Sequence, residues 1–211
     1  MDTNYIKMDG EPDKFEGGAI RYSKKGKGRF DLLPGEVVYL IEEYGELIFK
    51  ESDTIQVSLS DIIKDAYIDD VNRYIQTIFD FIAIEYAQGK IVDEKYHVIE
   101  ITYTSWFDGF IHALRDLAVH YEYGAEKYGV DNWKHGIPLI GGDRGGSFTD
   151  SGLRHLNQYL LGQTDEKHGV AFMWNFVNAV YLQQESKRIS NKCETIANDD
   201  VYAFDDDDIT D

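Results

Sequence analysis

The feature that most constrains the fold is an apolar run late in the chain. Between Val170 and Leu182, eleven of thirteen residues are apolar, and they surround a helix on all sides instead of forming one stripe. A helix of this kind is buried along its whole circumference, which predicts a position at the centre of a bundle. Its two polar residues, Asn175 and Asn178, need partners there, because an unpaired buried amide costs about 1–3 kcal/mol.

Several other segments have the apolar spacing of helices that pack around such a centre. Spacings of three and four predict helices over residues 33–49 and 105–128, and a long or broken helix over 59–89. Residues 96–103 fit either a short strand or a turn. The sequence therefore predicts an all-α fold, a helical bundle.

Capping residues indicate where some of these helices start and stop. Ser58 with Asp61 resembles a capping box, in which the acid stands in for the usual Glu. Gly162 is a typical helix stop. Thr164 is predicted to cap the next helix, with Asp165 in its first turn.

The two ends of the chain differ from this helical part. Residues 1–17 are polar without a sustained period, and we expect a mobile N-terminus. From Asp199 to Asp211, seven of thirteen residues are aspartate, so residues 191–211 are predicted to form an acidic, disordered C-terminal tail. A single helical domain would then cover residues 18–190.

The overall charge limits the partners of the protein. The 211 residues include 21 Lys and Arg against 39 Asp and Glu, a net charge of −18 at pH 7. Such a surface argues against binding nucleic acid or an anionic membrane. No apolar run approaches the roughly 18–20 residues that span a bilayer, and the N-terminus lacks a secretory pattern. We expect a soluble cytoplasmic protein, located in the host cytoplasm if a bacteriophage encodes it.

One extended N-terminal stretch opposes this acidic balance. Five cations fall within nine residues, interleaved with Gly26 and Gly28: Arg21, Lys24, Lys25, Lys27 and Arg29. Glycines let backbone N–H groups approach an anion closely, and the side chains add charge, which suits a polyphosphate ligand. A solvated loop that balances nearby acids explains the same stretch, and the residues alone leave both interpretations open.

Acids and histidines gather on the two predicted helices around Gly162. The group consists of Asp150, Arg154, His155, Asp165, Glu166 and His168. A short turn makes such helices antiparallel neighbours, which brings the end of the first against the start of the second. Carboxylates with imidazoles suit a divalent metal, and oxygen-rich sites favour Mg²⁺ or Mn²⁺ over Zn²⁺. A capped turn with buried, satisfied polar residues is the alternative.

Another charged group ends the helix predicted over 105–128. Glu122 lies at the border of the apolar stripe, where it can point into a cleft, whereas Glu126 projects further toward solvent. Lys127 follows directly. An ordinary charged helix end explains these residues equally simply.

Five sequence blocks in a fixed order are more specific than any one of these groups. They are Lys27–Pro34, Tyr123–Gly129, Asn132–Pro138, Asp150–His155 and Asp165–His168, followed by Trp174-Asn175. This order resembles the phage-associated dATP/dGTP diphosphohydrolase family, distant relatives of the MazG-like all-α nucleoside triphosphate pyrophosphatases. Shorter members run almost directly from the first block into the second, which implies that residues 50–105 are an inserted helical segment here.

The resemblance implies an activity and a set of site residues. The activity would be metal-dependent hydrolysis of a purine deoxynucleoside triphosphate, dGTP or dATP, to the monophosphate and pyrophosphate by a homo-oligomer. Carried over by position, the ligands of Mg²⁺ or Mn²⁺ would be Asp150, His155, Asp165 and His168. Position 171 is Ala where many relatives have a second His, so a further ligand would come from Glu122 or the inserted segment. The resemblance places Arg154 and Lys127 at the phosphates, and Asn132 and Trp133 near the nucleotide. We expect the substrate to be bound also by Asn175 and by the cations of the basic stretch: Arg21, Lys24, Lys27 and Arg29. In the catalytic step, Asp165 or Glu122 would take the proton of the attacking water.

Two other functions remain open at this stage. A non-catalytic interaction protein would use the acidic surface and tail to bind a basic partner. A binding module would hold the deoxynucleoside triphosphate without hydrolysing it.

Overall fold

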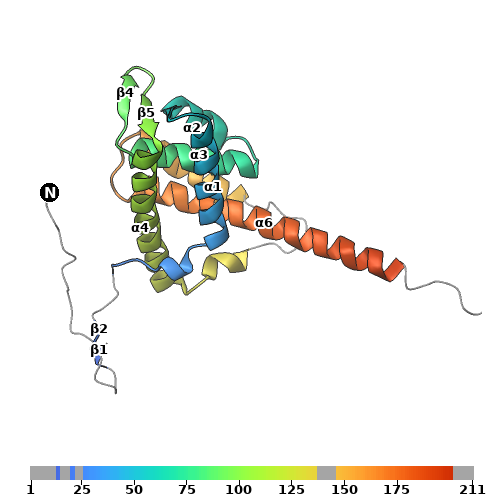
Figure 1. Cartoon of the computed structure of the whole chain (residues 1–211). Helices are drawn as coiled ribbons and strands as arrows, with labels where there is room; N and C mark the ends of the chain where they lie inside the picture. Colours follow the sequence, from blue (N-terminus) through green and yellow to red (C-terminus); the bar gives the residue numbers. More distant parts are fainter. Residues whose placement is uncertain (1–12, 15–19, 22–25, 137–145, 202–211) are drawn as a thin grey trace, which may run out of the picture.

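The computed structural model describes residues 13–14, 20–21, 26–136 and 146–201, and within them the fold is mainly helical (Figure 1). The helices are α1 Gly35–Glu51, α2 Leu59–Ala66, α3 Val71–Glu85, α4 Tyr103–Tyr128, α5 Gly146–Leu160 and α6 His168–Val201, with short 3-10 turns η1 Phe30–Leu32 and η2 Asn132–Gly136. The strands are β1 Asp13–Lys14, β2 Ile20–Arg21, β3 Thr54–Ser58, β4 Lys90–Asp93 and β5 Val98–Thr102. The predicted all-α class is confirmed, because the sheets are small additions to a helical body.

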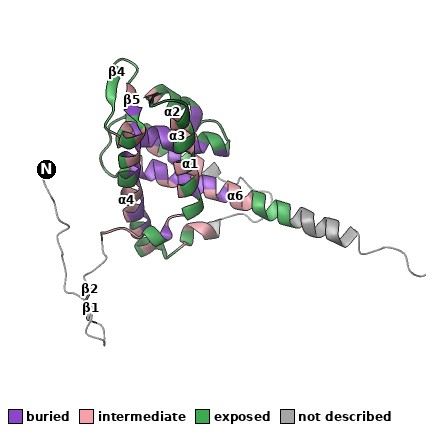
Figure 2. Ribbon diagram, in the orientation of Figure 1, coloured by how far each residue is buried: buried purple, intermediate pink, exposed green. Residues whose placement is uncertain are grey.

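The first half of α6 occupies the core, as its apolar circumference predicts. Residues 170–173 and 175–180 are buried, and α3, α4 and α5 all pack against this helix (Figure 2). The two asparagines find partners for at least one group each. The Tyr121 hydroxyl on α4 donates to Asn178 Oδ1 at 2.6 Å, and the Asn175 amide donates to the Ala171 carbonyl at 2.7 Å.

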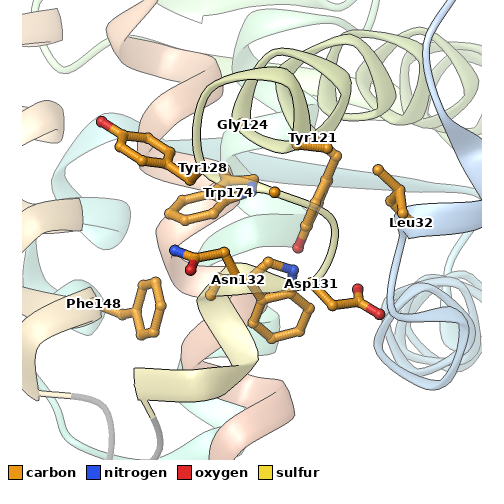
Figure 3. Close-up of a pocket in the computed structure, with 11 residues that line it drawn as sticks. Leu32, Tyr121, Gly124, Tyr128, Asp131, Asn132, Phe148 and Trp174 are labelled. Atoms are coloured by element: carbon orange, nitrogen blue, oxygen red, sulfur yellow. The ribbon is translucent and has the colours of Figure 1, made fainter.

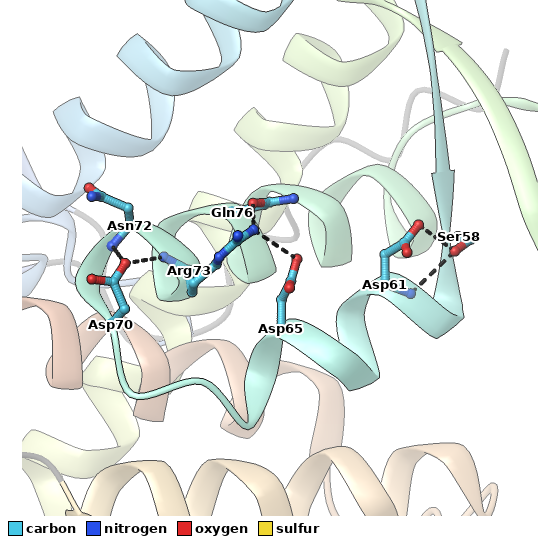
Figure 4. Close-up of polar contacts among 7 residues, drawn as sticks. All are labelled: Ser58, Asp61, Asp65, Asp70, Asn72, Arg73 and Gln76. Carbon is cyan, nitrogen blue, oxygen red and sulfur yellow. Dashed lines mark hydrogen bonds and ion pairs between the residues drawn. The ribbon is translucent and has the colours of Figure 1, made fainter.

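The segment over 59–89 forms two helices instead of one. The Ser58 side chain caps α2 by accepting from the Asp61 N–H at 3.2 Å, which confirms the predicted cap. The chain leaves the helix after Ala66, and Asp70 starts α3 by accepting from two backbone N–H groups (Figure 4). The break lets α3 turn its apolar face into the core against α1, α4 and α6.

Residues 96–103 contain a strand, so the first of the two alternatives for this segment is correct. Strand β5 lies between β3 and β4 in an antiparallel sheet, with Ile55 opposite Ile101. The segment over 50–105 therefore supplies both this sheet and α3, a helix of the core.

The connection between α5 and α6 differs from the prediction. Gly162 ends the α5 turn with a left-handed φ of +68°, as a helix stop does. However, α6 begins at His168, so Thr164 is not its cap, and Asp165 lies in the connecting turn. The turn is longer than expected, and its acids can fold back over the end of α5.

At its other end, α6 runs on to Val201 and extends away from the helical body (Figure 1). The helix thus includes residues 191–201, which the sequence assigns to the acidic tail. Residues 202–211 lie outside the described part of the chain, as do most of residues 1–17. None of the described helices is long and apolar enough to cross a membrane.

Candidate functional site

Three side chains from α5, α6 and the turn between them converge on one point. Nδ1 of His155 lies 3.1 Å from Nδ1 of His168, and Oε1 of Glu166 lies 2.9 Å from the first and 3.4 Å from the second. We call these three residues the His-Glu triangle. Two ligands of one ion, at bond lengths of about 2.1 Å, are separated by about 3.0–3.4 Å in octahedral or tetrahedral geometry. The spacing and chemistry of the triangle therefore fit a divalent metal ion.

Asp165 supports the triangle from outside. Its Oδ1 lies 2.9 Å from Nε2 of His168, the ring nitrogen that faces away from the other two donors. When Nε2 donates its proton to this carboxylate, Nδ1 presents a lone pair to the triangle. A carboxylate behind a ligating histidine fixes the ring and its tautomer in this way. The contact also lowers the pKa of Asp165.

Burial favours the neutral form of two imidazoles in this region, those of His155 and His120. It lowers the pKa of His155 below its usual value of 6.5, although the charge of Glu166 pulls in the opposite direction. His120 on α4 behaves in the same way, and the charges of Glu166, His155 and Lys167 all act on it. Neutral imidazoles are the form that binds metals.

The triangle borders a hollow of about 600 Å³. Glu166, His168 and Lys167 line one side of it, and Asp116 of α4 lines another. The Asp116 carboxylate accepts from the Tyr86 hydroxyl at 3.3 Å and lies 4.0 Å from the Lys167 ammonium. This acidic hollow thus combines the metal-type donors with a carboxylate and a cation.

A second cavity, of about 240 Å³, has mostly aromatic walls (Figure 3). We call it the aromatic pocket; it is lined by Leu32, Tyr121, Gly124, Ala125, Tyr128, Gly129, Asp131, Asn132, Trp133, Phe148 and Trp174. The Asn132 amide points toward the Phe148 ring in this view, and Trp174 lies beside them (Figure 3). Flat apolar walls with a few polar groups suit a nucleobase, which stacks on aromatic rings.

Two side chains, those of His120 and Lys127, contact walls of the aromatic pocket and also interact with the charge of Glu166 in the acidic hollow. The centroid of the Trp174 ring, a wall of the pocket, lies 5.7 Å from the centroid of the His120 ring. The charge of Glu166 acts on His120 and partly offsets the effect of burial on its pKa. The Lys127 ammonium lies 4.8 Å from the Tyr128 ring; hydrogen bonding to that tyrosine raises the pKa of Lys127, and Glu166 adds to the rise. Along α6, His168 and Trp174 are separated by a rise of about 9 Å.

In the basic stretch, two glycine N–H groups bind a carboxylate of the protein itself, that of Glu122. Glu122 accepts from the backbone N–H groups of Gly26 and Gly28 at 2.9 and 2.8 Å. Arg29 is paired with Asp31 through two hydrogen bonds of 2.6 and 2.7 Å. The glycines thus approach a carboxylate closely, as their type predicts, but in this structure the carboxylate is that of Glu122.

The structure brings together some of the predicted site residues and separates others. His155 and His168 are in the triangle, Asp165 is behind it, and Asn132 and Trp133 are in the aromatic pocket. Among the described residues, Asp150 and Glu122 lie outside the triangle, and Asn175 is buried against its own helix. Arg154 is exposed on α5, where its charge acts on His155. Arg21 lies in β2, Lys27 is half-buried, and Lys24 is outside the described residues.

Glu166 is the triangle member that the sequence did not single out. It belongs to the predicted acid and histidine group, but a position in the first turn of a helix would have pointed it along that helix. Because α6 starts at His168, two residues after Glu166, this glutamate lies in the turn and reaches His155. The signal available in advance was its position between two histidines on neighbouring helices.

Comparison with known protein families finds one whose model matches the part of the chain that carries this site. Residues 86–192 match the family described as dATP/dGTP diphosphohydrolase, N-terminal, a match that spans half of the chain and includes α4, α5 and the buried part of α6. No curated protein and no solved structure matched the chain. The His-Glu triangle and most of the aromatic pocket lie within the matched residues. The chain therefore belongs to the dATP/dGTP diphosphohydrolase family and is a hydrolase of nucleotide metabolism.

Proposed function

We propose that the protein hydrolyses a purine deoxynucleoside triphosphate, dGTP or dATP, to the monophosphate and pyrophosphate with the help of a divalent metal ion. The observation that carries this proposal is the convergence of three metal-type donor atoms, 2.9–3.4 Å apart, beside an open hollow. Family membership supports the nucleotide as substrate.

The substrate would lie along α4 and α6. The base would stack in the aromatic pocket, where Trp133 and Trp174 offer ring faces and Asn132 offers a hydrogen-bonding amide. The triphosphate would extend past His120 and Lys127 toward the triangle, a path consistent with the about 9 Å rise between Trp174 and His168. A cation on this path matters because the acidic hollow by itself repels phosphate.

The donor set favours Mn²⁺ over Mg²⁺. Mg²⁺ prefers oxygen ligands and retains several waters, whereas two imidazoles with one carboxylate suit Mn²⁺ and later transition metals better. His155, His168 and Glu166 would hold the ion, with Asp165 orienting the His168 ring. When bound, the ion would neutralise charge on the phosphates and make an attacking water more acidic.

The remaining chemistry falls to residues of the hollow. We assign the removal of the water's proton to Asp116, because it lines the hollow, in place of Glu122, whose two oxygens are already occupied. Lys167, which lies near Asp116, would stabilise the departing pyrophosphate. Asp165 is then a positioning residue, because it acts through the His168 ring.

The direct test is incubation with dGTP or dATP and Mn²⁺, followed by ion-exchange separation of the products. We expect equal amounts of monophosphate and pyrophosphate, and at least about a 100-fold loss of kcat/KM in His168→Ala. His112→Ala is the matched control, because His112 is an exposed histidine on α4 that lines neither cavity. Formation of nucleoside diphosphate with orthophosphate, or tight binding of the triphosphate without any product, would refute the proposal.

A further inference from the structure

The basic stretch is attached to α4 by one carboxylate. Both oxygens of Glu122 are used: Oε1 accepts from the Gly26 N–H at 2.9 Å and Oε2 from the Gly28 N–H at 2.8 Å. One turn earlier on α4, the Ala118 carbonyl accepts from the Arg29 N–H at 3.0 Å. Hydrogen bonds to an ionised acceptor are about twice as strong as neutral ones. Three backbone N–H groups, those of Gly26, Gly28 and Arg29, therefore fix this segment to the helix.

The fit between the two surfaces requires glycine at position 28. Gly28 has a left-handed φ of +85°, and a Cβ there would lie 2.8 Å from the Cβ of Ala118 and 3.1 Å from the backbone nitrogen of Val119. A side chain would clash with helix backbone that cannot move, so the loop would have to lift from α4. The attachment thus depends on Glu122 from one side and on Gly28 from the other.

The attached segment leads directly into the aromatic pocket. After Arg29 the chain forms η1, which packs on α4, and Leu32 of η1 is buried and lines the pocket. Tyr121, another residue that lines the pocket, directly precedes Glu122 in α4. A release of the segment would therefore remove one wall of the cavity without touching the His-Glu triangle.

We propose that Glu122 is a positioning residue, which fixes residues 26–32 as a wall of the aromatic pocket and so sets the affinity for the nucleotide. Its role in affinity rests on the function proposed above. This assignment differs from the metal-ligand and general-base roles that the sequence suggests for Glu122, because neither carboxylate oxygen faces the triangle donors.

Limited trypsin digestion of the full chain tests the attachment without reference to activity. Glu122→Ala and Gly28→Ala should each speed cleavage after Lys27 and Arg29, followed by mass spectrometry, by about tenfold or more. Glu122→Gln should lie between these and the wild type, because one amide oxygen can still accept. Glu126→Gln, an exposed acid one turn further along α4, is the control and should match the wild type. Wild-type cleavage rates in both Glu122→Ala and Gly28→Ala would overturn the proposal.

Steady-state kinetics with dGTP then tests the consequence. In Glu122→Ala and Gly28→Ala we expect KM to rise about tenfold while kcat stays within about twofold, as for a lost binding contact. A fall in kcat at unchanged KM would overturn the positioning role and restore Glu122 to the chemistry. If the wild type turned over no nucleotide, the proposed function would fail, whereas the digestion result would still decide the attachment.

Discussion

Ionisable groups gather where helices meet in two regions: the His-Glu triangle and an acidic cluster of Asp61, Asp65 and Asp80. The two regions differ in what surrounds the ionisable groups. In the triangle, lone pairs converge at the edge of an open hollow. In the acidic cluster, Arg73 lies 3.7 Å from buried Asp65 (Figure 4), and the Asp80 side chain is enclosed by protein.

The protonation of Asp80 shows what this enclosure does. Burial, together with the charges of Asp61 and Asp65, raises the pKa of Asp80 from its usual value near 3.8 to about 7, although hydrogen bonding from Gln76 opposes the shift. Tyr44 of α1 faces the same group, and burial raises the pKa of this phenol to about 12. With a raised pKa, Asp80 would have to lose a more tightly held proton before it could bind a metal ion. We therefore interpret the acidic cluster as structural and the triangle as functional. The same substitution, Asp to Asn, should therefore lower kcat in the hollow beside the triangle and raise the stability of the protein in the acidic cluster.

The largest effect is expected for Asp116→Asn in the hollow. If this carboxylate takes the proton of the attacking water, kcat should fall by about 10²–10⁴-fold. Mn²⁺ affinity, measured by calorimetry, should remain within about threefold, because Asp116 is not part of the triangle. A variant with normal kcat would remove Asp116 from the mechanism, and a variant without Mn²⁺ binding would make it a ligand.

Asp80→Asn should change stability and leave activity intact. Because the folded pKa is raised, the folded protein keeps a proton that the unfolded chain releases above about pH 4, so this group lowers the free energy of unfolding as pH rises from about 4 to 7. The variant removes this penalty, and urea unfolding should show it about 2–4 kcal/mol more stable than the wild type at pH 8, with little difference at pH 4. Equal stability at pH 8 would mean that Asp80 is ionised at no cost.

The smallest effect is expected for Asp150→Asn. The family resemblance implies that Asp150 would be a metal ligand, but this residue is exposed on α5 and lies outside the triangle. We expect kcat/KM to change by less than about threefold, since exposed substitutions away from a site have small effects. A loss comparable to that of His168→Ala, measured in the same assay, would mean that substrate binding brings α5 into a different arrangement.

The sequence predicts the parts of this molecule that depend on local pattern. The apolar circumference of residues 170–182 is sufficient to place α6 in the core, and the Ser58 cap follows from its neighbours. His155 and His168 could be grouped in advance because consecutive antiparallel helices place the end of the first beside the start of the second, and this holds although the turn is longer than expected.

Other features depend on contacts that no local pattern reports. Glu122 meets Gly28 across 94 positions of sequence, so its partner could not be inferred from α4. The late start of α6 is equally hidden, because Thr164 has the chemistry of a cap, and it is this start that brings Glu166 to the triangle. Asp65 and Asp80 lie within apolar helix faces, and their proximity follows only from how α2 folds onto α3.

The central claim is that the triangle holds a divalent ion, and a titration with Mn²⁺ followed by electron paramagnetic resonance tests it most directly. Free Mn²⁺ gives a strong signal that is lost on binding, so the count of bound ions does not depend on turnover. We predict one bound ion per chain in the wild type, retained in Glu122→Ala and lost in His155→Ala and His168→Ala. Unchanged Mn²⁺ binding in the two histidine variants would contradict the account.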